Sequence, residues 1–144
     1  MKLSEALGFT NIGRESDSAE IVVLHTGREL TPMALQAAAN LTKGLNFNVV
    51  LLAVHIVPYP LQLETLGAME EHLEHELSQA AEASPLPVNA RIAFARDLSE
   101  AFRQCVRPES LVVIGTRKHW WRTRPEKWAR ELTRNGFRTA VVQQ

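Results

Sequence analysis

The sequence predicts an α/β fold of three layers, in which an open sheet of five mainly parallel strands carries helices on both faces. Short runs of β-branched residues alternate along the chain with segments of helical periodicity. Such strict alternation requires crossover connections and therefore parallel strands. The length of 144 residues suits one domain, and a 45% share of hydrophobic residues can fill its core. We expect a tail over residues 1–19 and the α/β domain over residues 20–144.

Two of the predicted strands are apolar on both faces, as buried parallel strands are. Residues 21–25 form the first, and residues 49–57 form the second, which should be the most buried element. Between them we expect a helix. Thr31 supplies a hydroxyl for its N-cap, Pro32 suits its first turn, and Gly44 offers a left-handed stop.

The second half of the chain continues the alternation. Residues 64–83 have helical spacing with six glutamates and no Lys or Arg, which predicts an acidic amphipathic helix. Residues 88–94 alternate in polarity, which predicts an edge strand with one wetter face. Asp97 and Glu100 have capping-box spacing at the start of the next helix. A strand, a helix and a last strand follow over residues 111–116, 125–134 and 139–142.

Composition excludes several classes of protein. Sixteen basic and sixteen acidic residues cancel, which argues against a polybasic nucleic-acid binder. The single cysteine, Cys105, cannot form an intramolecular disulfide, and its place on an apolar helical stripe predicts a buried, inert thiol. No apolar run approaches the roughly 20 residues that span a bilayer, and the first residues lack the apolar core of a signal peptide. We expect a cytoplasmic protein without a membrane partner.

Open α/β sheets bind ligands outside the carboxyl ends of their strands, where the strand order reverses. Two loops stand out there. His25 to Arg28 follows the first strand, and Gly115 to Arg124 follows the fourth. Together they hold five Arg or Lys side chains and no acid, so they favour an anionic ligand.

The chain resembles the universal stress protein family, in its small single-domain form, over about residues 20–142. The resemblance rests on Ile21 to Val23 with Gly27 and Glu29, on Val49 to Pro58, on Arg96 and Asp97, and on Leu111 to Arg117. It implies the strand order 3-2-1-4-5 and a homodimer formed through Thr139 to Val142. It also implies a stress-related binding or regulatory role.

The resemblance further implies a nucleotide cleft between the first and fourth strands. The residues that it assigns to that cleft are Thr26, Gly27, Arg28, Val57, Gly115, Thr116, Arg117 and Lys118.

Members that bind ATP carry an acidic residue after the first strand and the pattern Gly-x2-Gly-x9-Gly-Ser/Thr after the fourth, and this chain departs from both. Thr26 replaces the acid, and Lys118 replaces the second glycine. A lysine forced into a left-handed conformation costs roughly 1–2 kcal/mol. Glu126 also places a carboxylate where a helix dipole would favour phosphate. We therefore expect a degenerate ATP site that binds no nucleotide or a different anionic ligand, with ATP or AMP binding as an alternative.

A second alternative is a protein-interaction module. Residues 117–130 form a basic face rich in tryptophan, which can dock an acidic partner, and Trp120 or Trp121 would then close the cleft. Nucleic acid is the less favoured partner because the patch is short and the domain is neutral.

Metal binding and catalysis are not indicated. One helix places two histidines and two glutamates at one-turn spacing, but two imidazoles make a weak site and solvent-facing charge is the simpler interpretation. Those residues are Glu71, His72, His75 and Glu76. His25 and His119 suit acid–base chemistry, yet neither has a serine, cysteine or carboxylate partner in the nearby sequence.

Overall fold

The computed structural model describes residues 19–57, 66–116 and 124–143, which alternate between strand and helix throughout. The elements are β1 (Ala19–Leu24), α2 (Leu30–Thr42), β2 (Phe47–Ile56), α3 (Leu66–Glu82), β3 (Asn89–Ala95), α4 (Leu98–Cys105), β4 (Leu111–Thr116), α5 (Arg124–Arg134) and β5 (Arg138–Gln143). The predicted order of elements is confirmed. The expected tail lies outside the described residues, except that Ala19 opens β1.

One parallel sheet organises the chain. Its order is β3-β2-β1-β4-β5, and every neighbouring pair is parallel. The central strand β1 pairs on both edges, with Val22 opposite Val50 of β2 and Val112 of β4. Both the α/β fold class and the implied strand order are therefore confirmed.

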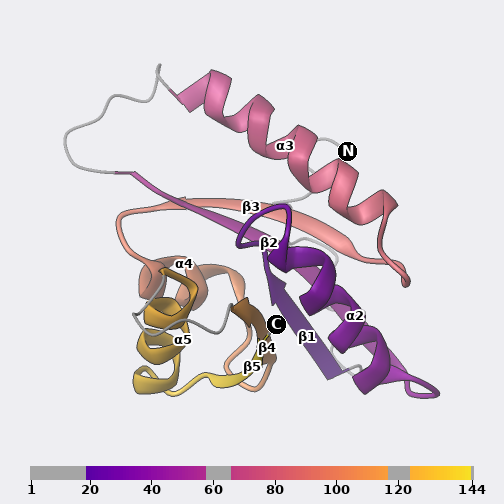
Figure 1. The fold of residues 1–144 in the computed structure, drawn as a ribbon. Helices are drawn as coiled ribbons and strands as arrows, with labels where there is room; N and C mark the ends of the chain where they lie inside the picture. The colour runs from indigo at the N-terminus through magenta and orange to yellow at the C-terminus, as the bar shows by residue number, and fades with distance from the viewer. Residues whose placement is uncertain (1–18, 58–65, 117–123, 144) are drawn as a thin grey trace.

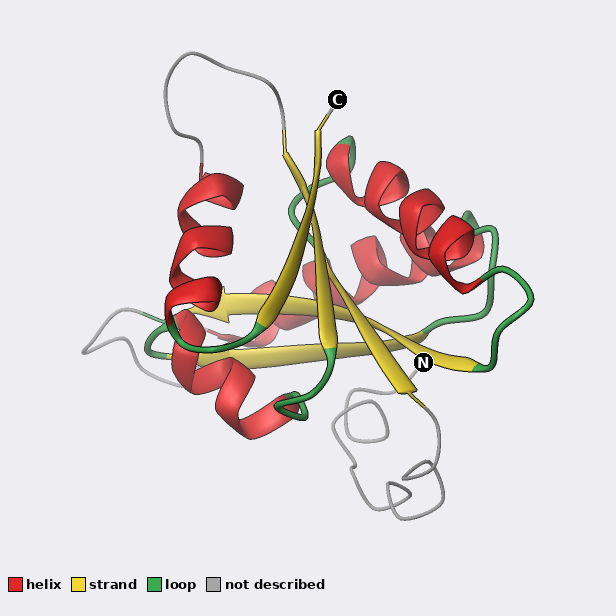
Figure 2. Cartoon of the chain, turned by 90° about the horizontal axis from the view of Figure 1, so that it is seen from below, coloured by secondary structure: helices red, strands yellow, loops and turns green. Residues whose placement is uncertain are grey.

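Helices cover both faces of the sheet (Figures 1 and 2). Helices α2 and α3 pack on one face, and α4 and α5 pack together on the other. Alternate residues of β1 point to the two faces, so Val23 joins the apolar cluster that includes Leu77 of α3, and Val22 joins the cluster that includes Phe102 of α4. The two apolar clusters hold the three layers together.

Two of the predicted helix signals are present as expected. The Asp97 carboxylate accepts a hydrogen bond of 2.8 Å from the Glu100 N–H and so caps α4. The Glu100 carboxylate in turn accepts one of 3.1 Å from the N–H of Arg96. Gly44 has a φ of +76° just after α2, as a left-handed helix stop requires.

The prediction for Thr31 was wrong. Helix α2 begins two residues earlier than expected, at Leu30, and Glu29 occupies the N-cap position without a side-chain capping bond. Thr31 is fully buried in the first turn, where its hydroxyl accepts the N–H of Thr26. The hydroxyl therefore joins the helix to the preceding loop and does not cap its own helix.

The prediction of a wetter face on β3 was also wrong, although the strand does lie at an edge of the sheet. Arg91 is only 6% exposed, and its guanidinium donates a hydrogen bond of 3.4 Å to the carbonyl of Cys105 at the end of α4. The alternating polarity predicted a face open to solvent. Helix α4 covers that face, and the carbonyl of Cys105 accepts a hydrogen bond from the Arg91 side chain.

In the part of the chain that the structure describes, every helix is too short or too polar to cross a membrane.

Candidate functional site

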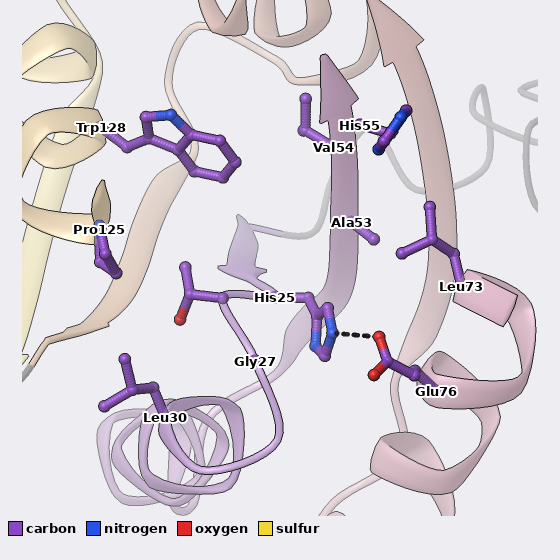
Figure 3. A pocket seen from close by; sticks show the side chains of 11 residues that line it. His25, Gly27, Leu30, Ala53, Val54, His55, Leu73, Glu76, Pro125 and Trp128 are labelled. Carbon is purple, nitrogen blue, oxygen red and sulfur yellow. Dashed lines mark ion pairs between the residues drawn. The ribbon is translucent and has the colours of Figure 1, made fainter. Parts of the chain in front are cut away.

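A cleft of about 420 Å³ lies at the carboxyl ends of β1 and β2 (Figure 3). This volume falls within the range of about 300–1,000 Å³ that is usual for small-molecule sites. Its lining residues are His25, Thr26, Gly27, Leu30, Ala53, Val54, His55, Leu73, Glu76, Pro125 and Trp128. Most of them are apolar, so the cleft suits a ligand with a hydrophobic ring and a few polar atoms.

The topology of the sheet explains why the cleft lies there. The loop after β1 leads to α2 on one face, whereas the segment after β4 leads to α5 on the other. Adjacent strands that send their connections to opposite faces open a crevice between them. Leu30 of α2 and Trp128 of α5 face this crevice from its two sides (Figure 3).

His25 connects three elements at one end of the cleft. Its Nδ1 lies 2.9 Å from the hydroxyl oxygen of Thr31, and its Nε2 lies 3.5 Å from Oε1 of Glu76. Glu76 reaches His25 from α3, as Figure 3 shows. A row of polar contacts from Thr31 through His25 to Glu76 therefore connects the start of α2 with the middle of α3.

Burial controls the protonation of His25. The side chain is largely removed from water, and this desolvation lowers the pKa of the imidazole below its ordinary value of 6.5. The charge of Glu76 and its polar interaction with the ring act in the opposite direction but are weaker. His25 is therefore neutral near pH 7.

The tautomer of His25 follows from its neighbours. Because the Glu76 carboxylate faces Nε2 and can only accept a hydrogen bond, that nitrogen carries the proton. Nδ1 then accepts a hydrogen bond from the Thr31 hydroxyl. Both ring nitrogens of His25 are occupied and Thr31 is fully buried, so neither residue presents a free polar group to the cleft.

Two of the residues assigned to the cleft by resemblance do line it. Gly27 has a φ of +129°, and this conformation turns the chain from β1 into α2, where the Gly27 carbonyl accepts the N–H of Thr31. The Thr26 hydroxyl oxygen is buried without a hydrogen-bond partner among the described residues. Because Thr26 lines the cleft, this orphaned hydroxyl is a candidate partner for a polar atom of a ligand.

Gly115 and Thr116 lie beside the cleft without lining it. A Cβ atom on Gly115 would come within 2.7 Å of the carbonyl oxygen of Leu30, so glycine lets the start of α2 approach β4 closely. Thr116 is fully buried, and in the described part of the chain its hydroxyl has no partner. Gly115 therefore has a packing role that is independent of phosphate binding.

Arg28 and Val57 do not line the cleft. The Arg28 side chain is 75% exposed, and its Nε lies 3.8 Å from Oε2 of Glu76. The backbone of Val57 is already engaged, because its N–H donates to Ala95 and its carbonyl accepts from Arg96. The structure therefore directs Arg28 toward a carboxylate and already pairs the N–H and the carbonyl of Val57 within the protein.

The remaining residues assigned to the site fall in a segment that the structure does not describe. Arg117 and Lys118 lie outside the described residues, as do His119, Trp120 and Trp121. Trp128, at the described end of the basic face, is half-buried against the core and lines the cleft. Trp128 therefore belongs to the wall of the cleft as well as to the basic face.

Glu76 is a cleft residue whose environment differs from the one that the sequence predicts. It was interpreted as solvent-facing charge on an acidic helix, yet its side chain is only 18% exposed and faces His25. A signal for this was present, because Glu76 lies one turn after Leu73 and next to Leu77, which is fully buried. That spacing places Glu76 at the edge of the buried stripe of α3.

The other candidate groups are not gathered into a site. No three His, Cys, Asp or Glu side chains among the described residues are placed to hold a metal ion. His72 makes only an exposed one-turn pair with Glu76, at 3.6 Å. Cys105 is half-buried against the core, and burial raises the pKa of its thiol while Arg91 opposes the shift.

Comparisons with known proteins identify the fold. A structure of a universal stress protein from Archaeoglobus fulgidus matches with a TM-score of 0.58 and 13% identity, and the match covers 92% of this chain and 98% of that one. A universal stress protein family member from Burkholderia pseudomallei matches with a TM-score of 0.58 and 21% identity, over 90% and 97% of the two chains.

A third match is the Archaeoglobus fulgidus protein in complex with dAMP, with a TM-score of 0.54 and 13% identity over 88% of this chain and 96% of that one. No family model and no curated protein sequence matches the chain. At these identities the likeness is one of architecture, and it agrees with the resemblance drawn from the sequence. The chain has the fold of the universal stress proteins.

Proposed function

We propose that this chain is a non-enzymatic regulator that binds the ring of a purine nucleoside or nucleotide in the cleft at the ends of β1 and β2. The observation that carries the proposal is the cleft itself, which lies at the switch point of the sheet and has apolar walls. Leu30, Val54, Leu73 and Trp128 provide surfaces against which a flat ring can pack. A structure of the same fold holds dAMP, which supports a purine as the ring.

Phosphate groups would add little to binding at the described end of the cleft. The Glu76 carboxylate repels an anion, and the guanidinium of Arg28 already faces that carboxylate at 3.8 Å. Glu126 adds a second carboxylate in the first turn of α5. We therefore propose that the ring supplies most of the affinity, and that the site is degenerate with respect to a triphosphate.

Catalysis is not part of this proposal. The only imidazole held by a carboxylate in the described cleft, His25, uses both ring nitrogens within the protein. Abstracting a proton from a ligand requires a free nitrogen within hydrogen-bond reach. His25 therefore acts as a fixed part of the wall, and the response to a ligand would be a change in shape or partner.

We also propose that the chain forms a homodimer through β5. This strand lies at one edge of the sheet, and Val141 on it is 47% exposed. An apolar edge strand is a ready template for pairing with a second copy.

Calorimetry tests the ligand proposal. Adenosine and guanosine, each also as monophosphate and triphosphate, are titrated into the full chain. At least one nucleoside should bind, and its triphosphate should bind no more tightly. Failure of both nucleosides to bind, or an affinity that rises with every added phosphate, would overturn the proposal.

A further inference from the structure

Glu76 offers a ligand an acceptor that is not saturated. Its carboxylate is mostly buried at the cleft wall, and its neighbours are His25 Nε2 at 3.5 Å, His72 Nε2 at 3.6 Å and Arg28 Nε at 3.8 Å. Charge-assisted hydrogen bonds are usually about 2.7–2.9 Å long. The imidazole of His25 therefore makes one long hydrogen bond to Oε1, and His72 and Arg28 stay at ion-pair distance from Oε2. A carboxylate has about four acceptor positions, so its remaining lone pairs can receive closer donors.

The position of this carboxylate is nevertheless well defined. His25 holds Oε1 from one side, and Thr31 fixes the imidazole by bonding to its other nitrogen. Thr31 is itself tied to the backbone N–H of Thr26. The network thus presents an oriented acceptor to the cleft, and the pre-organised position limits the entropy lost when a ligand binds.

The ring-binding walls and this acceptor together define a ligand class. A carboxylate can accept two parallel N–H bonds from a planar group. Guanine offers such an edge, because its N1–H and its 2-amino group lie side by side. On adenine, the ring nitrogens on either side of the amino group carry no proton. A carboxylate that accepts from this amino group would therefore face the lone pair of one of these nitrogens.

We propose that Glu76 is a specificity-determining residue that makes the cleft select rings with two adjacent N–H donors, as in guanine, over adenine. This inference rests on the proposed purine-binding function and names the base that it favours. Three of the described polar residues of the cleft agree with it. The Glu76 carboxylate is a hydrogen-bond acceptor, and the Nε2–H of His25 is directed at that carboxylate. The orphaned Thr26 hydroxyl can bond a further polar atom of the ring.

The test compares guanosine, inosine and adenosine by calorimetry on the full wild-type chain. Inosine keeps N1–H but lacks the 2-amino group. Guanosine should bind at least about tenfold more tightly than adenosine, with inosine between them, since one hydrogen bond to a charged group is worth about that factor or more. This comparison needs no variant, so it decides the matter even if a substitution disturbs folding.

Two variants then assign the selectivity to one residue. Glu76→Gln should reduce guanosine affinity about tenfold or more and bring it close to that of adenosine. The matched control is Glu71→Gln, which makes the same change at an exposed position of the same helix and should leave all three affinities unchanged.

The possible failures are distinct. Adenosine binding as tightly as guanosine, or selectivity that survives Glu76→Gln, would overturn the role of Glu76 and leave purine binding standing. If none of the three nucleosides binds, the proposed function fails and this inference fails with it.

Discussion

Nε2 of His25, just after β1, lies 3.5 Å from Oε1 of Glu76 on α3. This pair joins the end of the central strand to α3, which packs on β2 and β3. It places a carboxylate at one wall of an otherwise mainly apolar pocket. Under the proposed function, this pair favours certain ligands over others, and it predicts how the stability of the fold responds to acid.

The His25 environment predicts a loss of stability at acid pH. Because the pKa of His25 is lowered in the folded state, the unfolded chain binds more protons as the pH falls below about 6.5, and folding becomes less favourable. Glu76 faces the ring and opposes this shift, and Arg28 and His72 in turn face Glu76. Glu76→Gln should therefore lower the pKa of His25 further.

Imidazole resonances followed by NMR across the pH range measure this directly for wild type and Glu76→Gln. Wild-type His25 should titrate below 6.5, and lower still in the variant. A His25 that titrates at or above its ordinary value, or one indifferent to Glu76→Gln, would contradict the described environment.

Gly115→Ala should destabilise the fold. The added methyl group would lie 2.7 Å from the carbonyl oxygen of Leu30, so β4 and α2 must move apart. Overpacking of this kind costs about 1–3 kcal/mol in the free energy of unfolding, measured with urea. Gly67→Ala is the control, because the new methyl group meets nothing within 4 Å there and alanine favours a helix. Equal effects of the two changes would show that the close approach at Gly115 is unimportant.

Leu77 should anchor α3 to the sheet. Its side chain is fully buried, so Leu77→Ala should cost about 2–5 kcal/mol of unfolding free energy. Met69 on the same helix is 38% exposed, and Met69→Ala should cost at most about 1 kcal/mol. Chemical denaturation of both variants measures the difference. A mild effect at Leu77 would mean that α3 is held by other contacts.

The proposed dimer can be tested at Val141 on β5. Val141→Lys places a charge on the exposed face of the edge strand and should convert a dimer into a monomer in light scattering. Leu45→Lys, at a 62% exposed position far along the chain, is the control and should not alter the mass. A wild-type chain that is monomeric at every accessible concentration would refute the dimer.

Much of the fold could be predicted because the relevant signals are local. The apolar run before His25, the Asp97 and Glu100 pair and the positive φ at Gly44 each depend on residues close in sequence. Parallel topology then follows from the alternation of elements. These features need no knowledge of which helix meets which strand.

The site could be predicted only in part, because its chemistry depends on contacts between distant segments. Thr26 and Gly27 could be placed at the cleft by the general behaviour of open sheets. The meeting of His25 with Glu76 depends on how far α3 returns across the sheet, which no local pattern encodes. The wrong prediction for Thr31 has the same cause. Its hydroxyl bonds to the imidazole of His25 and does not cap its own helix.

The most direct test of purine binding in this cleft is NMR shift mapping of the full chain with guanosine and then adenosine. The largest changes should fall on the amides of residues 25–27 and 53–55 and on the indole N–H of Trp128, with guanosine saturating at the lower concentration. Changes confined to other surfaces, or no change with either nucleoside, would contradict it.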